Sequence, residues 1–64
     1  MDQVTTDERL LFRPDEAAHR LGIGRTKLYE LMRSGELRSV RVGGARRVSA
    51  TALAEFVAAL DSAA

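Results

Sequence analysis

Sixty-four residues with a mass of 7.0 kDa form one small domain at most, because a chain this short buries only about 60% of its unfolded surface. The absence of cysteine and the single histidine exclude a disulfide scaffold, a thiolate zinc site and the usual imidazole zinc site. No apolar run approaches the ~20 residues of a membrane span, and the opening MDQVTTDERL lacks the apolar core of a signal peptide. We therefore expect a soluble cytoplasmic protein without a cofactor.

The net charge of +1 conceals a strong segregation of charge along the chain. Residues 20–47 carry eight cations against two acids, whereas residues 1–19 and 48–64 are both net acidic. Seven of those eight cations are arginine, whose planar fork suits phosphate and guanine edges better than lysine does. A cationic middle creates a local positive potential that attracts a polyanion. The alternative is that these are ordinary solvated charges.

The chain begins with an acidic segment and then a short helix. Residues 1–9 lack periodicity, which is typical of a flexible tail. Residues 10–12 are apolar, and we expect them to be extended because Pro14 disfavours helix at the residue before it. Pro14 fits the first position of a helix that runs to about Leu21. The side of this helix expected to face inward carries Ala17, Ala18 and Leu21.

A glycine-containing turn at residues 22–24 separates this helix from a second one. The second helix is predicted from Arg25 to about Arg33, and Gly35 provides its stop. Its inward side is predicted to carry Leu28, Leu31 and Met32. Two short helices joined by such a turn, with a basic outer face, are typical of a helix-turn-helix. A plain helical hairpin has the same spacing and is the alternative.

A β-hairpin is predicted after the second helix. Residues 37–42 and 45–48 flank Gly43-Gly44, a dipeptide that favours a two-residue turn. Alternation of Val40 and Val42 with arginine indicates a half-buried strand, so we expect the hairpin to lean on the helices through its valines. A basic hairpin directly after a helix-turn-helix is a wing, although a solvated turn with incidental arginines is the alternative.

The last element is an amphipathic helix that Ser49 is expected to cap. Its apolar stripe consists of Leu53, Phe56, Val57 and Leu60. We expect this stripe to close the core across the first helix and the hairpin, with a docking face for a partner as the alternative. The predicted fold is mostly α with a small β-hairpin: a winged helix-turn-helix of three helices and a two-stranded wing. This domain spans residues 10–61, and residues 62–64 form a frayed end.

The run LFRPDEAAHRLGIGRTKLYELMRSGELRSVRVG resembles the small winged-helix proteins of the excisionase family, relatives of the MerR-type DNA-binding domain. The resemblance covers roughly residues 10–60. Its most specific parts are Pro14–Ala18, Leu21–Ile23, Leu28-Tyr29 and Ser34–Leu37. It implies that the second helix enters the major groove of DNA and that the wing lies along the backbone or the minor groove.

Three positions depart from the family pattern and affect local stability and wing placement. Arg13 replaces the usual hydroxyl residue before Pro14, so we expect the first helix to lack a side-chain cap. Gly24 stands where serine often caps the second helix, although it leaves room for a phosphate at the helix N-terminus. No aromatic residue stands near Val48 in the second wing strand.

The outer face of the second helix and the wing supply the predicted DNA contacts. Arg33 is predicted to bind a guanine edge, and Glu30 either accepts from a cytosine amino group or pairs with Lys27. Arg25 is expected to bind phosphate, and Tyr29 either reaches a phosphate or only packs on the core. The wing arginines are expected to contact the DNA backbone or a narrow minor groove. The full set is Arg25, Thr26, Lys27, Tyr29, Glu30, Arg33, Arg41, Arg46 and Arg47.

The sequence contains no catalytic constellation and no metal site, so we expect a binding protein rather than an enzyme. The resemblance implies an excisionase that binds and bends duplex DNA near attachment sites and recruits an integrase. Expected partners are therefore double-stranded DNA, an integrase or recombinase, and further copies of the chain on adjacent DNA sites, with no membrane. A small transcriptional regulator is the first alternative. A protein-interaction or antitoxin-like module, with the Leu53–Leu60 face left free, is the second.

Overall fold

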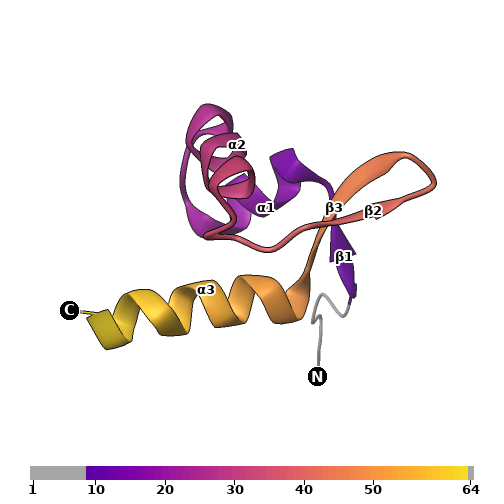
Figure 1. The fold of residues 1–64 in the computed structure, drawn as a ribbon. Coiled ribbons are helices and arrows are strands. Elements are labelled where there is room, and N and C mark those ends of the chain that lie inside the picture. Colours follow the sequence, from indigo (N-terminus) through magenta and orange to yellow (C-terminus); the bar gives the residue numbers. More distant parts are fainter. Residues whose placement is uncertain (1–8, 64) are drawn as a thin grey trace, which may run out of the picture.

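Local signals set the ends of three helices in the computed structural model, which describes residues 9–63 (Figure 1). The helices are α1 (Pro14–Leu21), α2 (Arg25–Ser34) and α3 (Ala50–Ala63). Gly22 follows α1 with a φ of 73°, a left-handed conformation that costs glycine little. The predicted helices are confirmed, and α3 continues to Ala63. Residues 1–8 of the predicted acidic tail lie outside the described residues.

The start of α1 shows how the chain compensates for the missing hydroxyl cap. Arg13 provides no side-chain cap, as predicted, because a guanidinium has no acceptor. Instead, the Arg13 backbone N–H donates to Glu16 Oε1 at 2.9 Å, and Arg9 Nη1 lies 2.8 Å from Glu16 Oε2. The pKa of Glu16 is lowered below its ordinary value of 4.5. The main cause is the hydrogen bond from the Arg13 backbone, and the hydrogen bond from Arg9 is the second. Glu16 thus fixes the conformation of the chain at the start of α1.

Three short strands form one antiparallel sheet in the order β1-β3-β2. They are β1 (Leu11–Phe12), β2 (Val40–Val42) and β3 (Ala45–Ser49). The predicted wing is the β2-β3 hairpin, and its two turn glycines have the positive φ values that a type I′ turn requires. The extended segment before Pro14 was predicted, but its pairing with β3 was not.

The core lies between α1, α2, the first turns of α3 and the inner ends of the strands (Figure 1). The predicted inward faces of α1 and α2 are confirmed, with Leu21 only partly buried. Leu37 is fully buried between α2 and the wing, and its N–H donates to the Leu31 carbonyl at 3.1 Å. The buried residues are Phe12, Ala17, Ala18, Leu28, Leu31, Met32, Leu37, Val48, Ala52 and Leu53.

The prediction that the hairpin leans on the helices through its β2 valines is wrong. Val40 and Val42 are 46% and 51% exposed, whereas Val48 of β3 is fully buried. The cause is the strand register, which pairs Arg41 with Arg46, two residues from Val48. Directly paired residues share a sheet face and alternate residues point the same way, so the valines lie on the face away from the core.

The prediction that the whole α3 stripe closes the core is also wrong for its outer half. Leu53 is buried and Phe56 packs against the core, but Val57 and Leu60 are 43% and 56% exposed. Helix α3 has 14 residues and α1 has eight, about 21 Å against about 12 Å, so the end of α3 extends past the body (Figure 1). Ser49 caps α3 as predicted, since its Oγ accepts from the Ala52 N–H at 2.9 Å.

Candidate nucleic-acid interface

Helix α2 presents a polar, mostly basic surface because its three apolar side chains all face the core. The six predicted contact residues of this helix, Arg25, Thr26, Lys27, Tyr29, Glu30 and Arg33, are all exposed. The N-cap residue before the helix is Gly24, which supplies no side-chain cap, and the first turn of the helix contains no acid. These features leave the positive end of the helix dipole open to an anion.

Glu30 lies on this surface beside Lys27, with Oε1 4.0 Å from the lysine Nζ. Both side chains are more than half exposed, so the pair is weak and easily rearranged. The intrahelical pairing that the spacing predicted is therefore present. It leaves Glu30 at the outer surface of α2, where the side chain can exchange lysine for another donor.

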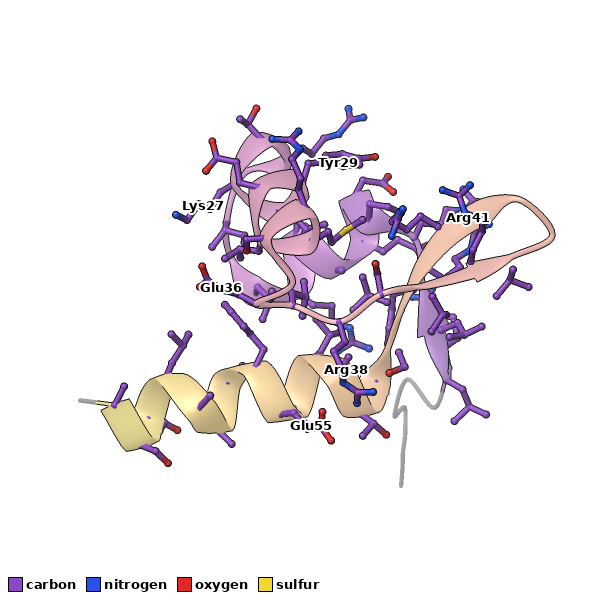
Figure 2. The ribbon with its side chains drawn as sticks, in the orientation of Figure 1. Lys27, Tyr29, Glu36, Arg38, Arg41 and Glu55 are labelled. Atoms are coloured by element: carbon purple, nitrogen blue, oxygen red, sulfur yellow. The ribbon has the colours of Figure 1, made fainter. Side chains whose placement is uncertain are left out.

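The wing brings two of its arginines to the same side as α2. Arg41 and Arg46 are paired across the hairpin and share the sheet face on which Val48 contacts the helices. Arg46 and Arg33 line one hollow of about 360 Å³ together with Tyr29 and Met32. Figure 2 shows Tyr29 extending from α2 toward the wing side and Arg41 rising from the wing. Two guanidinium groups and a phenol from distant parts of the sequence thus converge.

Arg47 points the other way. It is paired with exposed Val40 and stands one residue from Arg46, so its side chain lies on the opposite sheet face. Its Nη1 donates to the Arg46 carbonyl at 2.9 Å, and the residue is only partly exposed. The structure therefore brings Tyr29, Arg33 and Arg46 together and puts Arg41 on the same sheet face as Arg46. Of the other predicted contact residues, those of α2 are exposed on that helix, with Lys27 on its side away from the wing (Figure 2), and Arg47 lies on the reverse face of the wing.

Hydrogen bonds from the arginines themselves hold the wing in shape. Arg41 Nη1 donates to the Gly44 carbonyl at the hairpin tip at 3.2 Å. Arg46 Nη1 donates to Ser39 Oγ at 2.9 Å, linking β3 to the segment that enters β2. Both guanidiniums keep further N–H groups for a ligand, since each carries five donors.

The Arg38–Glu55 pair positions the wing and was not foreseen from the sequence. Arg38 Nη2 and Nε donate to Glu55 Oε1 at 2.6 and 3.2 Å, which ties the segment before β2 to α3 (Figure 2). The pair lies on the α3 side of the molecule, away from α2. A separation of 17 residues between different elements leaves no periodic signal that would have revealed it.

Two features are absent from residues 9–63. None of the helices there is long and apolar enough to cross a membrane. No three side chains among histidine, cysteine, aspartate and glutamate gather closely enough in this part of the chain to hold a metal ion.

The chain is similar to known proteins over most of its length. Residues 11–61 match the family model described as a helix-turn-helix domain. A protein named probable excisionase from Saccharopolyspora erythraea is 50% identical over 52 residues, which is 81% of this chain and 53% of that protein. An excisionase from Streptomyces ambofaciens is 42% identical over 54 residues, covering 84% of this chain and 86% of the relative. The chain thus spans about half of the first relative and most of the second. No solved structure matches significantly.

Proposed function

Because the chain belongs to the helix-turn-helix family that includes these excisionases, we propose that it is an excisionase acting through duplex DNA. The observation that carries the proposal is the shared surface of α2 and the wing, where Arg33, Arg46 and Tyr29 converge. A surface of this kind suits the curved, anionic backbone of DNA better than a small substrate. The protein then acts by binding and performs no covalent chemistry.

In the proposed complex α2 occupies the major groove and the wing lies along the adjacent backbone. Thr26, Lys27, Glu30 and Arg33 contact base edges and supply sequence preference. Arg25, Arg41 and Arg46 contact phosphates, which set position and most of the affinity. Tyr29 lies between the residues that contact bases and those that contact phosphates. Its hydroxyl donates to a DNA phosphate that lies against both α2 and the wing. Arg47 lies on the opposite face of the wing from this surface.

The proposed role requires more than one protein molecule on the DNA. A single module buries about 600–1,000 Å² on DNA, which limits its affinity and specificity. Neighbouring copies and an integrase bound to the same attachment junction hold one another close to the DNA. This raises the effective concentration of each protein at its binding site. Bending of the DNA by bound copies brings those sites together, and excision is favoured over integration.

The protein-interaction module is the second candidate, and the exposed outer half of α3 favours it. That candidate gives no reason for the cationic surface on the other side of the molecule. A transcriptional regulator would use the same α2 and wing surface and differs only in what the bound DNA then does.

A footprint and a recombination assay test the proposal together. We expect the chain to protect repeated sites in the DNA that flanks its own gene. We also expect it to raise excision by a cognate integrase on a substrate carrying both attachment junctions. Protection without a change in excision would identify a regulator instead. No protection of any duplex at low salt would eliminate both DNA-based roles.

A further inference from the structure

Ser39 lies in the segment that leads into β2, and it is partly buried. Its Oγ accepts a hydrogen bond from Arg46 Nη1 at 2.9 Å. The two residues stand seven apart in the sequence. They meet because the register pairs Val40 with Arg47, which sets Ser39 diagonally across from Arg46 on one face of the sheet. Ser39 is not among the residues that the sequence predicted to contact DNA.

Arg46 lines two neighbouring hollows of the surface. One is the hollow of about 360 Å³ that it shares with Tyr29, Met32 and Arg33. The other has a volume of about 320 Å³, and Ser39 is part of its wall. Ser39 lines only the second hollow. It therefore holds Arg46 without occupying the space in which Arg46 and Arg33 converge.

A second arginine lies directly opposite Arg46. Arg41 pairs with it across the hairpin, and like charges in directly paired positions repel each other. The two guanidiniums are held toward opposite ends of the hairpin. Arg41 Nη1 donates to the Gly44 carbonyl at the tip, whereas Arg46 Nη1 donates to Ser39 Oγ at the base. The Ser39 hydroxyl thus keeps Arg46 on the side of the hairpin where the sheet meets the helices.

We propose that Ser39 is a positioning residue for DNA binding. Its hydroxyl holds the Arg46 guanidinium beside Arg33 and Tyr29, where a DNA phosphate binds. The inference rests on the proposed function, which assigns this surface to DNA. An arginine side chain that is already held in place loses less conformational entropy when DNA binds, so the complex is tighter. The hydrogen bond to Ser39 leaves the other N–H groups of the guanidinium for the phosphate.

A matched pair of variants, S39T and S39V, separates the hydroxyl from the shape of the side chain. Threonine and valine are similar in shape and both suit extended backbone, but only threonine keeps an acceptor for Arg46. We expect S39V to bind a duplex carrying the footprinted site about threefold more weakly than S39T, as measured by fluorescence anisotropy. S39A also lacks the hydroxyl and should match S39V, which keeps the test open if S39V does not fold. Equal affinities with and without the hydroxyl overturn the proposal.

A double-mutant cycle shows whether the effect passes through Arg46. S39V should weaken binding about threefold in the R41A background but should change nothing in the R46A background. R41A is the matched control, because Arg41 lies on the same sheet face and donates to Gly44 instead of Ser39. A loss that persists in the R46A background overturns the proposal, since Ser39 would then contact DNA itself or act through the fold.

A measurement on the free protein distinguishes failure of this inference from failure of the proposed function. NMR relaxation of the arginine side-chain nitrogens reports how firmly each guanidinium is held. The Arg46 side chain should be more mobile in S39V than in S39T, and the Arg41 side chain equally mobile in both; equal mobility of Arg46 overturns the inference. If the wild-type chain binds no duplex at low salt, the DNA function fails and this inference with it. If the wild-type chain binds but S39T and S39V are indistinguishable, the inference alone fails.

Discussion

Replacing Arg46 with alanine tests the proposed interface most directly, because its neighbour Arg47 is a built-in control. The two residues carry the same charge and are adjacent in β3, yet they lie on opposite faces of the sheet. Only Arg46 lines the hollow shared with Arg33. Composition and net charge change identically in the two variants. Any difference between them therefore reports which sheet face meets the DNA.

The expected loss follows from one phosphate contact. Each contact contributes about 0.9 to the slope of log K against log salt, so Arg46→Ala should reduce the magnitude of that slope by about 0.9. A hydrogen bond to a charged group contributes about 1.5–3 kcal/mol, and exposure of Arg46 places the loss at the lower end. Roughly tenfold weaker binding is expected at moderate salt. Arg47→Ala should change neither the slope nor the affinity.

Fluorescence anisotropy of a labelled duplex, titrated at several salt concentrations, measures both quantities. Thermal unfolding of each variant is the accompanying control, because both side chains make only exposed hydrogen bonds and should leave stability nearly unchanged. Equal losses for the two variants would refute the reasoning. So would a loss for Arg47→Ala alone, since the reverse sheet face would then be the one that contacts DNA.

The other variants probe base recognition, the core, the N-terminal cap of α1 and the Arg38–Glu55 ion pair that joins the wing to α3. Arg33→Ala should cost about 1–3 kcal/mol on the preferred duplex and less on random duplexes; equal costs would show that Arg33 binds only phosphate. Leu37→Ala should lower the free energy of unfolding by about 2–5 kcal/mol in denaturant titrations, because Leu37 is fully buried. The lowered pKa of Glu16 means that its carboxylate stabilises the fold above pH 4.5 and loses this effect as the pH falls through the folded pKa. Glu16→Gln should therefore flatten the dependence of Tm on pH below 4.5, and an unaltered dependence would contradict this role for the carboxylate. Glu55→Gln should leave stability almost unchanged but increase hydrogen exchange in β2, if the pair with Arg38 restrains the wing.

Helix ends and the inward faces of α1 and α2 were predictable because their signals are local. Pro14 marks the start of α1, and Gly22 and Gly35 end α1 and α2 in left-handed conformations. The turn of the wing was predictable from Gly43-Gly44 for the same reason. Each of these signals acts within a few residues of itself and needs no knowledge of the remaining chain.

The two errors concern what lies opposite a patterned segment, which a local pattern does not contain. Alternation in β2 distinguishes a valine face from an arginine face, but only the register with β3 decides which one meets the core. The α3 stripe correctly indicated a helix with one apolar side. How much of that side is covered depends on the length of α1 and the sheet beneath it.

The position of the candidate interface therefore depends on a buried contact that touches no ligand. Phe12 of β1 pairs with Val48 of β3, and both side chains are buried. This anchors β3 so that Arg46, two residues earlier, faces the same side as α2. A slip of one residue would turn Arg46 away and bring Arg47 forward, while leaving the composition of the wing unchanged. The arginines make the wing cationic, but the packing of Val48 against the helices decides which of them faces α2.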